Sequence, residues 1–211
     1  MGLKYKIFRY GLLRRLKKGN RHYIFPTLRC NLDCDYCFNK SVPVRKKYSE
    51  MKFMDWKQII DSWENVQEIF LSGGEPFIYP DILPLLEYLI DKKYMITINT
   101  NLLKLPDEFI KPTLRLRIVA TYHLDLNGKS NKFVFKYYHL KNLGHNVIVE
   151  KFNKSGNNQI SFGNAKHMYV EKDELLECLV EPIHAYAPDG TLTKSRYELL
   201  TGVEYECPDL L

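Results

Sequence analysis

Three cysteines, Cys30, Cys34 and Cys37, fall within eight residues of one another. Cysteine thiolates bind zinc and iron–sulfur clusters, and a total of five cysteines suits metal ligation in a reducing compartment better than a disulfide framework. A four-iron cluster normally takes four cysteines, so three ligands on one loop would leave one iron free to bind a substrate or cofactor. The spacing therefore indicates a metal centre with an open coordination position.

A structural zinc site is the alternative for these thiols. It would need a fourth donor, for which His22, Cys178 and Cys207 are the candidates. Zinc motifs usually pair their cysteines in two separate Cys-x2-Cys units, and this sequence has no second unit. A non-catalytic module, in which an iron–sulfur or zinc centre only stabilises the fold and a partner binds elsewhere, is therefore kept as the second hypothesis.

A second motif, Gly73-Gly74-Glu75-Pro76, follows the apolar run Ile69-Phe70-Leu71. Glycine permits backbone angles and close approaches that other residues do not, so this strand end could lie against a ligand. A tight turn from strand to helix would explain the same residues without any function. The motif alone therefore does not identify a site.

The next two predicted strands also end in polar residues. Asn99 and Asn101 end the third strand, although an ordinary strand-ending turn accounts equally well for Asn101. His123 and Asp125 follow the fourth strand and could face the same site, while a place on a surface loop is the more common fate of a histidine. His123 and Asp125 are the candidates for catalytic roles.

The cysteine spacing, Cys-x3-Cys-x-aromatic-Cys with Tyr36 as the aromatic residue, resembles the motif of the radical S-adenosylmethionine (radical SAM) superfamily. The Gly-Gly-Glu-Pro segment resembles that family's Gly-Gly-Glu motif, and it follows about one βα unit later, as in the family. The resemblance covers about residues 20 to 165. It implies a 4Fe-4S cluster on the three cysteines, with S-adenosylmethionine (SAM) chelated through its amino and carboxylate groups at the open iron.

The resemblance also implies positions for the rest of the cofactor. The backbone around Tyr36 would contact the adenine. The edge formed by Gly73, Gly74 and Pro76 would hold the methionine amino group, and the Glu75 carboxylate would face that ammonium with opposite charge. Asn99 and Asn101 would lie beside the cofactor or substrate, and His123 and Asp125 would lie where the family places ribose or substrate contacts.

The sequence around these candidate site residues predicts short strands that alternate with helices, which is typical of βα units and a parallel sheet. Strands are predicted near residues 22–28, 67–72, 94–99, 114–121 and 146–150, with a weaker one near 159–162. Helical spacing of apolar residues predicts helices around 56–63, 82–89 and 133–140, the last ending at Gly144, and a short helix after 104. With the resemblance, this pattern implies an α/β fold, a partial (βα)6 TIM-like barrel.

Three segments are expected: a basic N-terminal arm (1–20), the partial barrel (21–174), and a C-terminal hairpin and tail (175–211). The first 22 residues hold eight of the 31 basic residues and no acid, so the rest of the chain is close to neutral. A nucleic-acid-binding surface over the whole protein is therefore not supported. An anionic partner would meet the arm, which could equally be a solvated helix packed on the body.

The C-terminal segment contains a predicted β-hairpin, His184 to Ser195, with Pro188-Asp189-Gly190 as its turn. It resembles a hairpin that carries an auxiliary cluster in some family members, but Ser195 stands where a cysteine is expected. The hairpin is therefore interpreted as a truncated version, kept as a lid over the open barrel, with Cys178 and Cys207 free of metal.

The resemblance implies an activity and partners. An electron from a donor such as flavodoxin or ferredoxin would cleave SAM to a 5′-deoxyadenosyl radical, which abstracts hydrogen from a substrate. The family's many reactions share one fold, so the substrate is not identified. No apolar run reaches the roughly 20 residues that span a bilayer, and a cytoplasmic location is expected.

Overall fold

The computed structural model describes residues 20–34, 37, 39, 47–123, 130–152, 166–167 and 185–193. Along these residues the elements are β1 (Asn20–Thr27), α2 (Phe53–Asp61), β2 (Val66–Gly73), the short 3-10 helix η2 (Pro76–Ile78), α3 (Ile82–Asp91), β3 (Met95–Thr100), β4 (Leu116–His123), α4 (Ser130–Asn142), β5 (Asn146–Phe152), β6 (Lys166–His167), β7 (Ala185–Tyr186) and β8 (Leu192–Thr193). The predicted alternation of strands and helices is confirmed.

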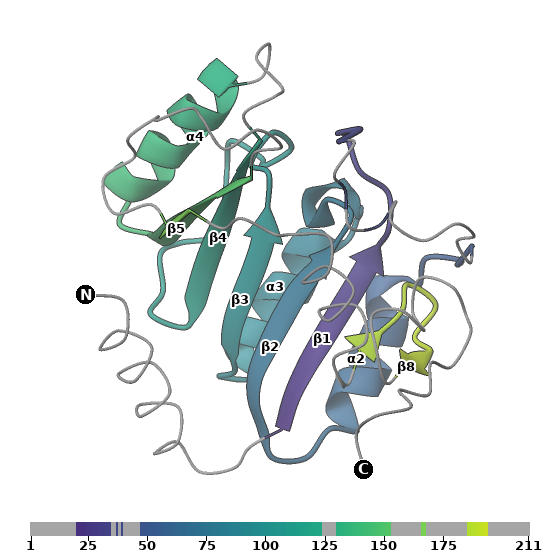
Figure 1. Ribbon diagram of the computed structural model, residues 1–211. Coiled ribbons are helices and arrows are strands. Elements are labelled where there is room, and N and C mark those ends of the chain that lie inside the picture. Colours follow the sequence, from purple (N-terminus) through teal and green to yellow (C-terminus); the bar gives the residue numbers. More distant parts are fainter. Residues whose placement is uncertain are drawn as a thin grey trace, which may run out of the picture.

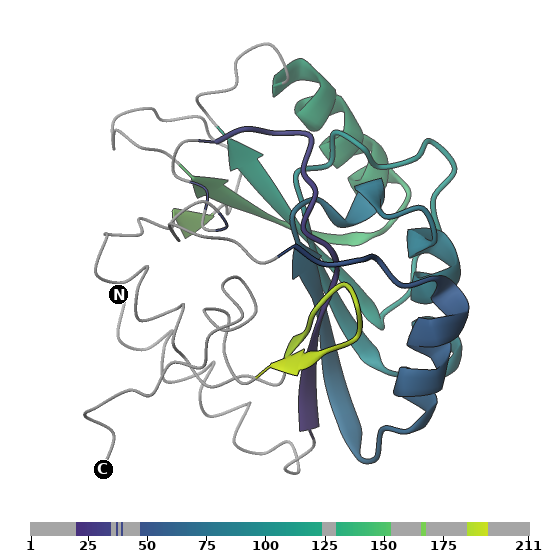
Figure 2. The same ribbon diagram turned by 90° about the vertical axis from the view of Figure 1, so that its right-hand side faces the viewer.

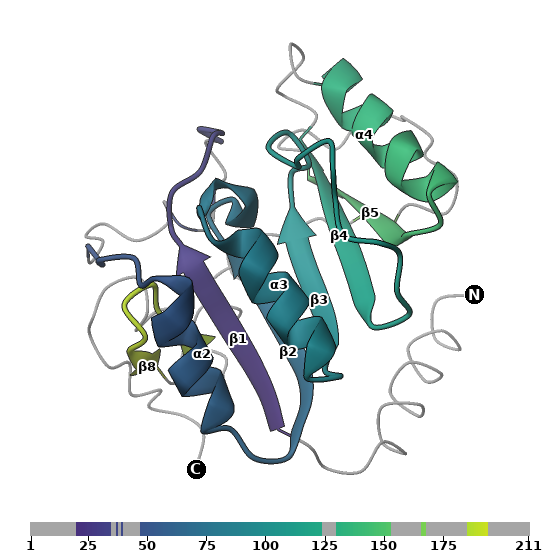
Figure 3. The ribbon, with the colours of Figure 1, turned by 180° about the vertical axis from the view of Figure 1, so that it is seen from behind.

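One sheet organises the molecule, with the strand order β6-β5-β4-β3-β2-β1-β7-β8 (Figure 1). Among the described strands, neighbours are parallel except for β7 and β8, which run antiparallel to each other. Helices α2, α3 and α4 cover one side of the curved sheet (Figure 2), and the view from behind shows α2 and α3 in front of the strands (Figure 3). Over the described strands the sheet is an unclosed α/β layer, as expected for a partial barrel.

Alternation along the strands fixes which side of the sheet packs on the helices. Side chains one residue apart point to opposite faces, so every second residue of a strand joins the core. The core side chains with no exposed surface include Trp56, Ile60, Ile69, Leu71, Leu85, Leu86, Leu89, Ile98 and Ile118. Burial of each large apolar side chain contributes about 1.5–3 kcal/mol, so a truncation such as Leu86→Ala should cost about 2–5 kcal/mol.

The local sequence explains where α4 ends and why a predicted helix is absent. Gly144 ends α4 with a φ of 91°, as its position predicted, and its N–H bonds to the Lys141 carbonyl at 3.0 Å. The predicted helix after residue 104 is wrong, because residues 101–115 contain no helix. Proline disfavours the helical conformation of the residue before it, so Pro106 and Pro112 each oppose a helix that would run through this segment.

The C-terminal hairpin is confirmed, but its expected place is wrong. Gly190 takes a φ of 79° in the turn, and its N–H bonds to the Ala187 carbonyl at 2.9 Å. β7 pairs with β1, with Ala185 opposite Tyr23, and the turn packs on Met51, two residues before α2. The described hairpin therefore extends the sheet beside β1 instead of forming a lid.

Several predictions lie outside the described residues. These are the basic arm up to residue 19, the weaker strand at 159–162, Tyr36, Asp125, Cys178 and Cys207. None of the helices within the described ranges combines the length and apolarity needed to cross a membrane.

Candidate cofactor site at the carboxyl ends of the strands

The cysteine loop leaves the carboxyl end of β1, where the sequence predicted it. Cys30 is exposed, Cys34 is buried and Cys37 is partly buried. The Leu32 N–H donates to the Cys30 Sγ at 3.4 Å, and the Cys37 N–H donates to the Cys34 carbonyl at 3.1 Å. These local bonds fold the loop back on itself at the sheet edge.

An acidic residue outside the predicted site holds the base of this loop. The Glu50 carboxylate accepts a hydrogen bond from the Thr27 hydroxyl and two from the Arg29 guanidinium, both at 2.7 Å. Burial alone would raise the pKa of Glu50, but the bonds from Arg29 and Thr27 outweigh it and lower that pKa. Glu50 therefore ties Thr27 and Arg29, just before Cys30, to the chain entering α2. No motif in the sequence marks Glu50.

The two glycines of the second motif lie directly against the cysteine loop. The Gly74 N–H donates to the Thr27 carbonyl at 3.0 Å, and the Glu75 N–H donates to the Arg29 carbonyl at 2.8 Å. A Cβ atom on Gly73 would lie 2.2 Å from the Thr27 oxygen, and one on Gly74 would lie 2.1 Å from the Arg29 oxygen. The close approach that requires glycine here is therefore made to the loop that carries the cysteines.

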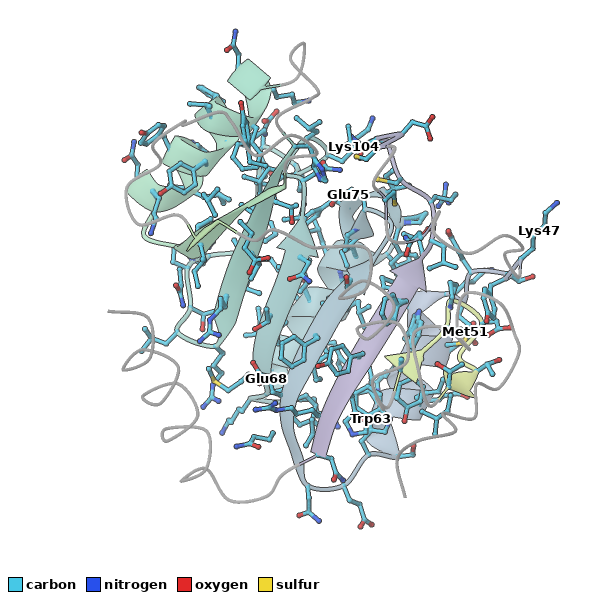
Figure 4. All side chains as sticks on the ribbon, viewed as in Figure 1. Lys47, Met51, Trp63, Glu68, Glu75 and Lys104 are labelled. Carbon is cyan, nitrogen blue, oxygen red and sulfur yellow. The ribbon has the colours of Figure 1, made fainter. Side chains whose placement is uncertain are left out.

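Glu75 is buried, with 1% of its surface exposed, and it bonds to the neighbouring strand end. Its Oε1 accepts from the Thr100 hydroxyl at 2.7 Å and from the Phe77 N–H at 3.1 Å, and its Oε2 accepts from the Asn101 N–H at 2.7 Å. Burial raises the pKa of Glu75 to about 7, although these three bonds oppose the shift. Glu75 lies at the upper ends of the strands, and Pro76 begins the η2 turn beside it (Figure 4).

Asn101 joins this edge to the cysteine loop. Its Nδ2 donates to the Asn31 Oδ1 at 3.0 Å and contacts the Cys30 Sγ at 3.9 Å, while its Oδ1 accepts from the Leu103 N–H at 3.0 Å. Asn99 lies two residues earlier on β3, opposite Val119 on β4. The structure therefore brings Asn101 to the cysteines and places Asn99 lower on the sheet.

His123 reaches a second thiol from the end of β4. Its Nδ1 lies 3.5 Å from the Sγ of Cys34. This contact joins a candidate catalytic residue to a candidate metal ligand, which the sequence did not predict. The other catalytic candidate, Asp125, and the adenine-side Tyr36 lie outside the described residues.

The surroundings of Cys30 work against its thiolate form. Although Cys30 has an exposed surface, desolvation of its thiol raises its pKa, and the negative charges of Glu75 and Cys37 add to this shift. A metal that binds a thiol displaces its proton, so the cysteines would become thiolates when the metal group binds.

Among the described ranges, no three or more His, Cys, Asp or Glu side chains gather closely enough to hold a single ion. The donor chemistry fits an iron–sulfur cluster, because three thiols come from one loop at the carboxyl ends of the strands. Asn101 donates a hydrogen bond toward the Cys30 Sγ, and the His123 Nδ1 contacts the Cys34 Sγ.

His22, which the zinc hypothesis needed as a fourth ligand, lies near the other end of β1. Its ring stacks on Trp63 with centroids 4.2 Å apart. His22 lies five positions before Thr27 on the strand, which corresponds to roughly 16 Å. Figure 4 shows Trp63 at the opposite end of the strands from Glu75. His22 therefore does not belong to the cysteine site.

Comparisons with known proteins agree with this geometry. The chain is 30% identical over 112 residues to a candidate glycyl-radical enzyme activating enzyme of Methanocaldococcus jannaschii, which is 52% of this chain and 41% of that protein. It is 29% identical over 102 residues to the mycofactocin maturase MftC of Mycobacterium tuberculosis, which is 47% of this chain and 24% of that one. The chain thus spans less than half the length of each.

A solved structure shares the fold. SuiB of Streptococcus suis, in its crystal structure bound to the precursor peptide SuiA, superposes with a TM-score of 0.56 at 19% identity, over 91% of this chain and 46% of that one. A family model of the Radical SAM superfamily matches residues 24–175. The match covers the carboxyl half of β1, both motifs and the strand ends that surround the cysteines, so this chain belongs to the radical SAM superfamily, whose members use a 4Fe-4S cluster and SAM.

Proposed function

We propose that this chain is a radical SAM enzyme in which Cys30, Cys34 and Cys37 hold a 4Fe-4S cluster. The proposal rests on the hydrogen bonds that Gly74, Glu75 and Asn101 make at the carboxyl ends of β2 and β3. They fasten the cysteine loop to Gly74 and Glu75 at the end of β2, and through Asn101 to the end of β3. Three strand ends therefore converge on the loop that would hold the cluster.

The residues of this edge would hold the cofactor in a fixed orientation. The backbone of Gly73 and Gly74 and the Glu75 carboxylate would bind the methionine ammonium of SAM, since Glu75 keeps acceptor capacity on Oε2 beyond its bond to Asn101. Glu75 and Asn101 are almost wholly buried, so the hydrogen bonds that fix their orientation are shielded from water.

When bound, the cluster would supply the electron that splits SAM into methionine and a 5′-deoxyadenosyl radical for hydrogen abstraction. The electron would come from a donor such as flavodoxin or ferredoxin. The chain itself binds, orients and shields these groups.

A peptide is the first substrate class to test. The solved protein that shares this fold was crystallised with a precursor peptide. This structural similarity bears on the fold and not on the substrate. Modification of a peptide should therefore be assayed separately from cleavage of SAM.

Anaerobic reconstitution followed by a cleavage assay tests the proposal. The protein should bind about four irons per chain and should release 5′-deoxyadenosine from SAM when reduced by dithionite. Cys34→Ala should lose both properties. The matched control is the double variant Cys178→Ala/Cys207→Ala, which should keep both.

Two outcomes would overturn the proposal. The first is stoichiometric zinc without iron after reconstitution, which would favour the non-catalytic metal-binding module. The second is unchanged SAM cleavage in the Cys34→Ala protein, which would show that the ligand assignment is wrong.

A further inference from the structure

Two polar side chains reach the cysteine thiols from different strands. Asn101, just after β3, contacts the Cys30 Sγ through its Nδ2 at 3.9 Å. His123, the last residue of β4, contacts the Cys34 Sγ through its Nδ1 at 3.5 Å. Neither side chain belongs to the cysteine loop or to the Gly-Gly-Glu-Pro motif.

The orientation of the Asn101 amide is set by its other bonds. Its Oδ1 accepts from the Leu103 N–H at 3.0 Å, so the Nδ2 group must face the cysteine loop. The same Nδ2 donates to the Asn31 Oδ1 at 3.0 Å, and the Asn101 N–H is bound by Glu75 at 2.7 Å. Asn101 is 6% exposed, so this arrangement is held within the protein.

The position of His123 is set by the sheet. Its backbone pairs with Phe152 on β5, and the preceding residue, Tyr122, is packed in the core at 4% exposed. Cys34 is 8% exposed, so its contact with the imidazole is largely shielded from water. Because water screens such a contact weakly here, a hydrogen bond to this sulfur is stronger than one on the surface.

We propose that Asn101 and His123 are positioning residues that donate hydrogen bonds to the Cys30 and Cys34 thiolates and thereby raise the reduction potential of the cluster. The inference rests on the proposed function, because it requires a cluster on these cysteines. Donors to ligand sulfurs favour the more negative, reduced state, so they shift the potential upward. Two donors on two ligands would make this cluster easier to reduce.

The test compares midpoint potentials, measured by EPR spectroscopy of the reconstituted protein at poised potentials. His123→Leu removes the donor, whereas His123→Asn keeps an amide N–H near the position of Nδ1. We expect a lower midpoint potential in His123→Leu and recovery toward the unaltered value in His123→Asn. Asn101→Ser keeps an oxygen for the Leu103 N–H but is too short to reach Cys30, and it should also lower the potential.

The matched control is His139→Leu, which alters a histidine in the last turn of α4, the turn that leads into β5. Its potential should equal that of the unaltered protein. Equal potentials in His123→Leu, Asn101→Ser and the unaltered protein, at equal iron content, would overturn the inference, as would identical shifts in His123→Leu and His123→Asn.

Loss of the cluster has its own interpretation. If His123→Leu takes up no cluster while its circular dichroism is unchanged, restored uptake in His123→Asn supports the donor role, and absent uptake in both contradicts it. Failure of the unaltered protein to bind iron would instead overturn the proposed function, so the two failures are distinguishable.

Discussion

The Oε2 atom of Glu75 accepts a hydrogen bond from the backbone N–H of Asn101 at 2.7 Å, which joins the end of β2 to the end of β3. Oε1 of the same carboxylate accepts from the Thr100 hydroxyl and from the Phe77 N–H. A buried carboxylate thus holds the edge on which the cysteine loop rests. Its charge makes this edge sensitive to pH.

The stability of the metal-free protein should fall as pH rises from about 4.5 to about 7. Burial raises the pKa of Glu75 from 4.5 to about 7 in the folded state, so the folded protein binds more protons than the unfolded chain within this window. The shift corresponds to a loss of roughly 3 kcal/mol across the window. Urea denaturation at pH 5 and at pH 8 would measure it.

Glu75→Gln cannot ionise and should flatten this pH dependence, while Thr100→Val keeps the carboxylate and should retain it. Equal slopes in Glu75→Gln and the unaltered protein would mean that another group titrates.

Glu75→Gln should also weaken SAM binding by about tenfold or more at pH 8, because it removes the charge that would face the methionine ammonium. Iron content should stay unchanged. The control is again Thr100→Val, which removes one bond to the carboxylate but keeps its charge. Anaerobic calorimetry would give the affinities, and an equal loss in both variants would assign the effect to the edge geometry instead of the charge.

Gly73→Ala should destabilise the protein far more than Gly144→Ala. Both glycines have positive φ, 125° and 91°. A Cβ at Gly73 would lie 2.2 Å from the Thr27 carbonyl oxygen, whereas one at Gly144 would meet its nearest atom, on Pro112, at 4.0 Å. We expect the difference in unfolding free energy to exceed about 2 kcal/mol. Similar urea midpoints for the two variants would show that the backbone near Thr27 can move to accept a Cβ at Gly73 without loss of stability.

Glu50→Gln should loosen the cysteine loop with little effect on global stability. The Arg29 side chain is 57% exposed, so its ion pair with Glu50 should contribute less than about 1 kcal/mol. Hydrogen exchange of residues 28–39 should nevertheless quicken, because Glu50 fastens both Thr27 and Arg29. In the control, Asp61→Asn, an ion pair with Lys57 and Lys92 is weakened elsewhere. If hydrogen exchange of residues 28–39 is as slow in Glu50→Gln as in Asp61→Asn, Glu50 does not hold the loop.

Much of the sheet could be predicted from the sequence, because its strands are buried apolar runs bounded by polar or glycine residues. The predicted strands at 67–72 and 146–150 correspond to β2 (Val66–Gly73) and β5 (Asn146–Phe152), with shifts of two residues or fewer. The order of the motifs along the chain then placed the cysteines and Glu75 at one edge, since the carboxyl ends of parallel strands lie together.

Long-range contacts could not be predicted in the same way. Glu50 lies 21 residues from Arg29 and has no neighbour in the sequence that indicates its role. His123 lies 89 residues from Cys34, and only the parallel register of β4 brings it there. β7 has two residues, too few for any periodicity to show that it pairs with β1.

The pairing of β7 with β1 also has a consequence for synthesis on the ribosome. Ile24 and its partner Tyr186 are separated by 162 positions. At about 5–20 residues per second, translation of that interval takes roughly 8 to 30 s. During this time the nascent β1 has an unpaired edge that can recruit a strand from another chain. Chaperone access to the emerging chain, and not only the stability of the finished sheet, should therefore determine the yield of folded protein in the cell.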